Sequence, residues 1–419
     1  MANVNLKRMA WRNLWRHRRR TILTLSAIVF GTFLSIIMQS MQDMNWADMI
    51  RVAARLGAGH VTMQHPEYLD APTMSRSVTN VTQLRAVASS HPDTSHVVER
   101  IPGFALLSTA RENIGAGFLA VSPEHESEDT LQILEAITEG AFFESSTDSG
   151  IILGATLANN LDAELGSKIV YTLTDRDGEV VSALARVSGI IQTGAKTVDS
   201  TICLLPIDTV RELIGFGPED TIQVASFIDD QRQSDAVAAN LKADVPATGV
   251  AVLTWAELQP DLASFILMKL AGSWFIMGIV GVLVAAGIFN TMFVGVMERL
   301  REFGIMLAVG FTPKQLFRLI MWESSWMATV GLAGAAIVTV GPYWYLSNVG
   351  IDLTALMAGM EAAELEVAGI GLPNPMMVGI YRSNLVMICT LAVSAVLLSG
   401  LYPAWRACRT EPVETIRVG

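Results

Sequence analysis

Four stretches of the chain are apolar along their whole length, with charged residues only at their ends. The uncharged runs are 21–42, 270–297, 324–351 and 383–405. A transmembrane helix needs about 20 apolar residues to cross about 30 Å of hydrocarbon, and soluble core helices rarely stay apolar for so long. The pattern therefore predicts an integral membrane, α-helical protein with four transmembrane helices.

These runs divide the chain into segments with different expected environments. We predict an amphipathic cytoplasmic helix at 1–20 and transmembrane helices at 21–42, 265–297, 313–351 and 383–405. A large extracytoplasmic α+β domain is expected at 43–261, inserted between the first two transmembrane helices. The remaining segments are a cytoplasmic coupling helix and loop at 298–312, an outer loop at 352–382 and a cytoplasmic tail at 406–419.

Lysine and arginine mark three segments as cytoplasmic. They cluster before the first apolar run, in the loop between the second and third, and after the fourth, whereas 352–382 is mainly acidic. The positive-inside rule then predicts that both termini are cytoplasmic and that the large domain is periplasmic. The first apolar run is too long for a signal peptide and lacks a cleavage site of the A-x-A type, so we expect an uncleaved anchor.

The large inserted domain is acidic and shows the patterns of strands and short helices. It contains 31 Asp and Glu residues against 13 Lys and Arg, an excess larger than the whole chain's net charge of -11, which argues against nucleic acid as a partner. Alternating runs predict strands at 96–109, 115–121, 168–174, 180–190, 201–206, 222–228 and 250–255. Helical patterns lie at 131–137, 155–165, 208–214 and 233–243, with Asp208 as a helix start and 175–178 as a hairpin turn.

Motifs for catalysis and metal binding are missing from the sequence. The nearest fragment to a P-loop, 166–168, lacks the upstream glycine, and there is no H-E-x-x-H or G-x-S-x-G. His60, His65 and Asp70 could form a metal site, but solvated loop residues are the favoured interpretation. We therefore expect no catalytic residues, no metal and no cofactor in this chain.

The charged segment after residue 297 has strong helix signals. A helical pattern extends from Met297 to about Val309, and Gly310 suits a left-handed C-terminal cap. Thr312, Pro313 and Gln315 then form the sequence of a capping box that starts a new helix. The corner is either a solvated connector or a surface that receives force from a cytoplasmic motor.

Two motifs carry a resemblance to a known family. The first reads E-R-x-x-E-x-G-x-x-x-A-x-G and consists of Glu298, Arg299, Glu302, Gly304, Ala308 and Gly310. The second is the tail pattern P-A-x-x-A at 403–407, followed by P-x-x-x-[L/I]-R at 412–417. The chain resembles the FtsX/MacB-type permease family of ABC transporters, and its stretches 59–70, 154–161 and 254–255 are most similar to the LolC/LolE lipoprotein-releasing permeases.

The resemblance implies a permease subunit of a bacterial inner membrane that works by mechanotransmission. A separate cytoplasmic ABC ATPase dimer would bind ATP and Mg, and a second permease chain, membrane lipid and a periplasmic carrier or adaptor would be the other partners. The expected cargo is a lipoprotein or similar lipidated molecule. A MacB-like tripartite efflux pump and an FtsX-like signal relay that activates a cell-wall hydrolase are the alternatives.

The resemblance also implies two sets of functional residues. Those expected to couple to the ATPase are Glu298, Arg299, Glu302, Gly304, Ala308, Gly310 and Pro313. Those expected to line an acyl-chain pocket, unless they face lipid or a neighbouring helix, are Phe30, Phe33, Ile36, Ile37, Met38, Phe265, Met268, Lys269 and Phe275. Lys269 could meet a lipid headgroup or extend to the interface, and Glu323 is expected to pair because an unpaired carboxylate would be costly in lipid.

Overall fold

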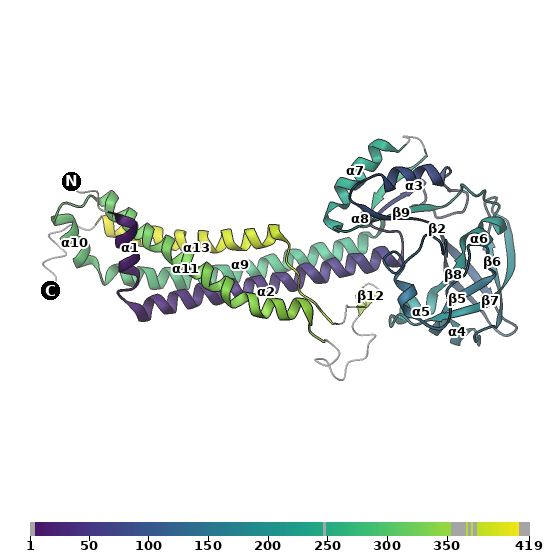
Figure 1. Ribbon diagram of the computed structural model, residues 1–419, viewed down its shortest axis with the longest axis horizontal. Coiled ribbons are helices and arrows are strands. Elements are labelled where there is room, and N and C mark those ends of the chain that lie inside the picture. The colour runs from purple at the N-terminus through teal and green to yellow at the C-terminus, as the bar shows by residue number, and fades with distance from the viewer. Residues whose placement is uncertain (1–4, 246–248, 353–365, 368–369, 372–374, 410–419) are drawn as a thin grey trace. The chain divides into compact units, whose positions relative to one another are not determined.

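The computed structural model describes residues 5–245, 249–352, 366–367, 370–371 and 375–409 (Figure 1). The chain forms two compact units. The first, here called the helical unit, comprises 1–45, 267–353 and 374–419. The second, the sheet unit, comprises 46–266 and 354–373. The predicted outer loop at 352–382 and the predicted cytoplasmic tail at 406–419 lie partly outside the described residues.

The helical unit is built from long apolar helices and two short ones. Its helices are α1 (Leu6–Leu14), α2 (Arg18–Leu56), α9 (Pro260–Met297), α10 (Leu300–Ala308), α11 (Pro313–Asn348) and α13 (Arg382–Cys408). Helices α2, α9, α11 and α13 are long and apolar enough to cross a membrane, which confirms the prediction of four such helices. Helices α2 and α9 also contribute residues to the sheet unit.

The structure differs from the sequence prediction at both ends of α2. The helix expected over 1–20 is interrupted at 15–17, between α1 and α2. At the other end, α2 continues to Leu56 instead of ending near residue 42. The extension is helical because Trp46, Met49, Ile50 and Ala53 recur at helical spacing and are buried together against α9 residues.

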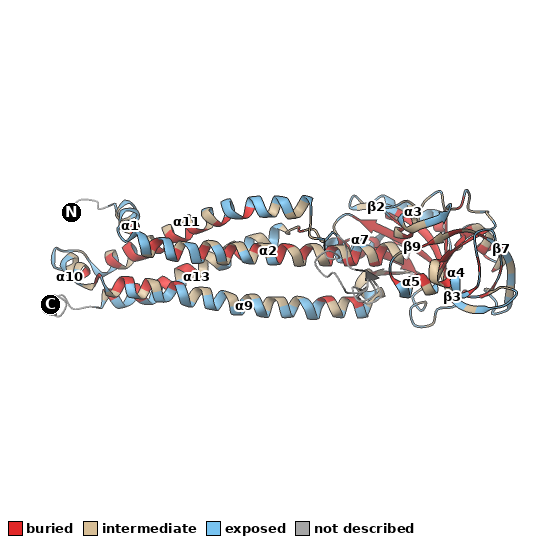
Figure 2. Ribbon diagram, turned by 90° about the horizontal axis from the view of Figure 1, so that it is seen from below, coloured by how far each residue is buried: buried red, intermediate tan, exposed pale blue. Residues whose placement is uncertain are grey.

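Small residues allow close packing within the helical unit. A Cβ added at Gly331 of α11 would lie 2.5 Å from Cγ2 of Ile28, and one added at Gly334 would lie 2.8 Å from Cγ2 of Val29. Both neighbours belong to α2. In contrast, α9 carries exposed residues over much of its length (Figure 2), and a Cβ at its Gly278 would meet nothing within 4 Å.

The sheet unit is an α+β fold around a ten-stranded sheet. Its strands are β1 (Val61–Gln64), β2 (Thr94–Ser108), β3 (Asn113–Val121), β4 (Ile137–Gly140), β5 (Gly150–Gly154), β6 (Lys168–Thr174), β7 (Val180–Ile191), β8 (Ile202–Pro206), β9 (Gln223–Ile228) and β10 (Ala251–Thr254). The order is β10-β1-β9-β2-β3-β8-β5-β7-β4, and β6 pairs with β2 and β7. Most pairs are antiparallel, with β3/β8 and β5/β7 parallel.

Short helices pack on this sheet. They are α3 (Val81–Ser89), α4 (Ala155–Asn160), α5 (Lys196–Thr201), α6 (Ile207–Leu213), α7 (Ser234–Asp244) and α8 (Trp255–Leu258), with 3-10 turns at Gln132–Ala136 and Gln231–Gln233. A separate two-stranded ladder pairs β11 (Glu366–Val367) with β12 (Ile370–Gly371). The apolar core of the sheet unit is formed largely by inward-facing residues of β2, β3 and β5 to β8.

Several local predictions for the sheet unit can be scored. The seven predicted strands are present, and the 175–178 turn closes the β6–β7 hairpin with Gly178 at φ 89°. The helix predicted at 131–137 is wrong, because a 3-10 turn there leads directly into β4. The start of α6 was also misplaced: Pro206 is the N-cap, and Asp208 lies in the first turn. Strands β1 and β5 and helices α3 and α5 were not predicted.

Candidate functional site: the α10 corner of the helical unit

The chain turns sharply on both sides of α10, and local sequence chemistry fixes the second turn. Gly310 adopts φ 107°, the N–H of Phe311 donates to the carbonyl of Met306 at 3.0 Å, and the N–H of Gly310 donates to Leu307 at 3.1 Å. This is the Schellman pattern that closes a helix. The predicted capping box then starts α11 and is confirmed by reciprocal bonds of 2.8 and 3.3 Å between Thr312 and Gln315.

One face of α10 is buried against the other helices. Phe303 is almost fully buried and Gly304 is buried beside it. Phe303 belongs to a cluster with residues from four further helices: Ala10, Val296, Leu316, Leu319, Ile320, Ala404 and Ala407. Because α1, α9, α11 and α13 all contribute to this close-packed cluster, a displacement of α10 must change its packing against each of them.

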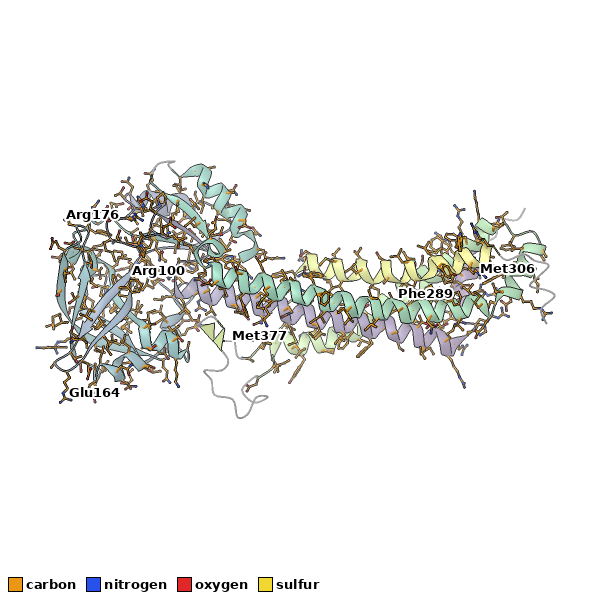
Figure 3. The ribbon with its side chains drawn as sticks, turned by 180° about the vertical axis from the view of Figure 1, so that it is seen from behind. Arg100, Glu164, Arg176, Phe289, Met306 and Met377 are labelled. Carbon is orange, nitrogen blue, oxygen red and sulfur yellow. The ribbon has the colours of Figure 1, made fainter. Side chains whose placement is uncertain are left out.

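The opposite face of α10 is exposed and partly apolar. Ile305 and Val309, four residues apart, are 50% and 78% exposed, and Arg301 precedes them on the same face. The predicted coupling residues Ala308, Gly310 and Pro313 are exposed as well. Exposed β-branched residues on a short, capped helix form a firm surface on which another protein can dock. Met306 of α10, labelled in Figure 3, is half-buried.

Charged side chains tie α10 to the rest of the helical unit. Glu298 pairs with Arg20 at 3.0 Å, and Glu302 pairs with Arg16 at 2.9 Å. The predicted coupling residues Glu298 and Glu302 thus have partners at the start of α2 and just before it. Their contribution within this chain is to fix the orientation of α10, and a contact with an ATPase stays a prediction.

Arg299 forms the buried part of the same network. Its Nη1 donates to both carboxylate oxygens of Glu323 at 3.3 Å, and its Nε donates to Glu302 at 3.4 Å. The side chains of Arg299 and Glu323 are only 6% and 12% exposed. Asn13 donates a further bond of 2.8 Å to Glu323. The expected pairing of Glu323 is therefore confirmed, and it joins α11 to the segment between α9 and α10.

The residues predicted to line an acyl pocket have different environments, and their shared role stays a prediction. Phe30 and Phe33 have ring centres 6.3 Å apart on α2, whereas Phe265 packs edge-to-face on Trp46. Ile36 is buried, and Phe33, Ile37 and Phe265 are half-buried. The other predicted positions have exposed side chains: Phe30, Met38, Met268, Lys269 and Phe275.

The helical unit instead contains a small cavity that the sequence did not indicate. It measures about 90 Å³ and is lined by α2, α9 and α13, including Gly31, Thr32, Ser35, Val284 and Ile388. None of the nine predicted pocket residues lines it. It is smaller than the ~150 Å³ cavity that accommodates benzene. Its lining is made mainly of small or branched residues, which carry no sequence signal for a binding site.

The sheet unit contains a second network of buried charged side chains, which was not predicted from the sequence. Arg100 of β2, labelled in Figure 3, pairs with Glu126 through two bonds of 2.8 and 2.9 Å, and both side chains are fully buried. The same guanidinium donates to the carbonyls of Thr130, at 2.8 Å, and of Gly57. Since Gly57 directly follows α2, Arg100 places a cation at the C-terminal end of that helix, where it is favourable.

The histidine weighed as a metal ligand has a different environment. Nδ1 of His60 accepts a hydrogen bond of 3.3 Å from the amide of Ile228, and the ring packs against Phe227. Burial, with a smaller effect of the Arg51 charge, lowers the pKa of His60 to about 4. Among the residues that the structure describes, no three His, Cys, Asp or Glu side chains gather as metal ligands.

Comparisons with known proteins match both parts of the chain. Residues 21–244 match the MacB-like periplasmic core domain, and residues 274–412 match the FtsX-like permease C-terminal family. The chain is 24% identical over 277 residues to the lipoprotein-releasing system transmembrane protein LolC of Xylella fastidiosa, which covers 64% of each protein. With LolC of Neisseria meningitidis the identity is 22% over 320 residues, or 75% of each.

A third relative is named as an export protein rather than a lipoprotein-releasing protein. The pyoverdine export ATP-binding/permease protein PvdT of Pseudomonas putida is 24% identical over 424 residues, covering 97% of this chain and 58% of that protein. The two family matches together extend over both the sheet unit and most of the long helices. The chain therefore belongs to the FtsX/MacB-type family of ABC transporter permeases.

Proposed function

We propose that this chain is a permease subunit that couples ATP hydrolysis by a separate ABC ATPase to the extraction of lipoproteins, or similar lipidated cargo, from a bacterial inner membrane. In this proposal both termini are cytoplasmic and the sheet unit is periplasmic. The observation that carries the proposal is the two-faced α10: Phe303 is buried among four helices, whereas Ile305 and Val309 are exposed. The names of the LolC relatives support lipoproteins as the cargo.

Force would enter through the exposed face of α10. An ATPase dimer that binds ATP and Mg would dock on Ile305 and Val309 and move when nucleotide binds. The Arg299–Glu323 pair and the Phe303 cluster would carry this movement to α1, α9, α11 and α13, and the Glu298–Arg20 pair would carry it to α2. Because α2 and α9 each supply residues to both units, movement of these helices would reach the sheet unit.

A second permease chain, identical or paralogous, would complete the path for the cargo. Phe30, Met38, Met268 and Phe275 are exposed in a single chain. They could therefore contact acyl chains in a space between two chains rather than within one. Apolar side chains on a membrane helix also face lipid, so exposure alone does not assign these four positions to the pocket. They stay candidates for it.

The sheet unit offers a surface for a periplasmic carrier or adaptor. Exposed apolar side chains gather on adjacent strands, with Phe104 and Leu106 on β2, Val170 on β6, and Val180 and Leu184 on β7. Val170 and Leu184 are directly opposite each other in the β6–β7 pair. Exposed apolar side chains on neighbouring strands are typical of protein interaction sites.

The proposal is tested by identifying what binds the chain. The chain would be purified with its ATPase in mild detergent without nucleotide, and the bound molecules would be identified by mass spectrometry. The proposal would be supported by bound acylated lipoprotein that is released when ATP is added but not when a non-hydrolysable ATP analogue is added. A periplasmic adaptor without lipidated cargo would instead favour efflux, which the similarity to PvdT supports as the second candidate. A cell-wall hydrolase would favour signal relay.

A further inference from the structure

We infer that a groove between α1 and α11 binds the headgroup of an anionic phospholipid. The groove has a volume of about 360 Å³ and is lined by Asn5, Lys7, Arg8, Trp11 and Trp326. All five residues belong to the helical unit. This inference goes beyond the proposed function, since it concerns neither the ATPase nor the cargo.

The walls of the groove are held in place by contacts between the two helices. The indole Nε1 of Trp326 donates to the carbonyl of Lys7 at 3.1 Å. The rings of Trp11 and Trp326 meet edge-to-face with centres 5.0 Å apart, and Nζ of Lys7 lies 4.6 Å from the centre of the Trp322 ring. The groove is therefore a defined site and not a gap beside a loosely attached helix.

The charge around the groove is positive and largely uncompensated. Residues 1–42 contain Lys7, Arg8, Arg12, Arg16, Arg18, Arg19 and Arg20 but no aspartate or glutamate. Arg16 and Arg20 pair with carboxylates near α10. Within the described parts of the chain, Lys7 and Arg8 form no ion pair with a carboxylate, although both side chains are exposed. An anion in the groove would have two cations within reach.

The aromatic lining indicates that this anion is a lipid headgroup rather than a soluble ion. Trp11 lies on α1 and Trp15 is its C-terminal cap, whereas Trp322 and Trp326 lie on α11, one of the four helices able to span a membrane. Tryptophan is enriched at the headgroup level of membranes, and basic pockets beside membrane helices bind acidic headgroups. The indoles would lie beside the glycerol region while Lys7 and Arg8 contact the phosphate.

The test compares two variants that remove the same charge. Lys7→Gln/Arg8→Gln removes the cations of the groove, whereas Arg18→Gln/Arg19→Gln removes two exposed cations outside its lining. The full chain would be placed in nanodiscs containing dioleoylphosphatidylglycerol and dioleoylphosphatidylcholine, and the phospholipids retained on release into detergent would be counted by native mass spectrometry. A cation near an anionic membrane surface contributes about fivefold in affinity.

The expected result is retention of phosphatidylglycerol in preference to phosphatidylcholine by the unaltered chain. The groove variant should lower this preference by roughly 10- to 30-fold, and the control variant by less than about threefold. The charge-preserving Lys7→Arg/Arg8→Lys should retain it, which separates loss of charge from misfolding. Equal losses in the two Gln variants would indicate attraction to the bulk surface and overturn the inference, as would a lack of preference in the unaltered chain.

Discussion

Breaking the buried Arg100–Glu126 pair should destabilise the sheet unit far more than breaking an exposed pair. In Arg100→Met, the Glu126 carboxyl group would lose its ion-pair partner in a fully buried place, where the hydroxyl of Thr130 at 2.6 Å is the one remaining donor among the described residues. Removing one partner of a buried ion pair costs about 3–5 kcal/mol. The carbonyl oxygens of Gly57 and Thr130 also lose a donor. We expect the equilibrium constant for unfolding to rise at least about 100-fold.

The double variant Arg100→Met/Glu126→Leu gives the sharper prediction. It removes both charges, and replacing a buried pair by apolar residues is often neutral or favourable by about 1–4 kcal/mol. The two freed carbonyls still cost about 1–3 kcal/mol each. Because both variants free these carbonyls, the double variant should be more stable than Arg100→Met alone by about 3 kcal/mol or more, although it carries an additional substitution.

The assay is urea denaturation of the full chain in mild detergent, read by pulse proteolysis within the sheet unit. The control is Arg111→Met, which breaks the 2.6 Å pair between Arg111 and Asp162. The side chains of these two residues are 77% and 65% exposed. Such pairs contribute about 0–1 kcal/mol. The reasoning is refuted if Arg100→Met and Arg111→Met cost the same, or if the effects of Arg100→Met and Glu126→Leu simply add.

Three further predictions concern other parts of the chain. Ile305→Glu should lower the affinity for the partner ATPase at least about tenfold in a pull-down titration, because it places a charge on an apolar docking face, whereas Val180→Glu on the sheet unit should not. Gly331→Ala should lower the thermal stability of the detergent-solubilised chain by about 1–3 kcal/mol through overpacking, whereas Gly341→Ala, where a Cβ meets nothing within 4 Å, should be neutral or stabilising. His60 has a pKa of about 4 in the folded chain and an ordinary value of 6.5, so the unfolded chain binds a proton at higher pH than the folded chain does. The free energy of unfolding should therefore fall as the pH drops from about 6.5 towards 4. In urea denaturation at several pH values, His60→Asn should make this fall less steep.

The parts of the fold that sequence could predict are those determined by local chemistry. Long apolar runs predicted the four helices, because only a hydrocarbon environment favours such composition. Gly310 and Thr312 predicted the corner after α10, since each satisfies backbone groups within three to five residues of itself. Alternation predicted most strands of the sheet unit, although β5, which is buried along its whole length, has no alternation to detect.

Asp43 shows why the end of the first long helix could not be predicted. A carboxylate at the end of an apolar run reads as the point where a helix meets water. In the structure Asp43 is buried and accepts bonds from Gln39 at 2.7 Å, the amide of Tyr381 at 3.1 Å and Asn384 at 2.8 and 2.9 Å. Two of these donors come from the start of α13, far away in sequence. The carboxylate is satisfied by tertiary structure, so the helix continues past it.

The sequence indicated the corner at α10 but not which of its side chains are exposed, and its role in coupling stays a prediction. The motif drew attention to Glu298, Arg299 and Glu302 as contacts for a partner, yet each is engaged within the chain. The exposed Ile305 and Val309 lie between the motif positions and were not singled out. Which side of α10 faces inward depends on the packing of Phe303 with four other helices. That tertiary contact cannot be inferred from the local sequence of α10.

The central claim is that this chain turns ATP hydrolysis into release of lipidated cargo, and reconstitution tests it most directly. Proteoliposomes would contain the chain, its partner ATPase and a fluorescently labelled, acylated lipoprotein, and release to a soluble acceptor would be followed on adding ATP. The account predicts ATP-dependent release, lost in Ile305→Glu although the ATPase still hydrolyses ATP. Sustained hydrolysis by the unaltered complex with all lipoprotein left in the membrane would contradict it.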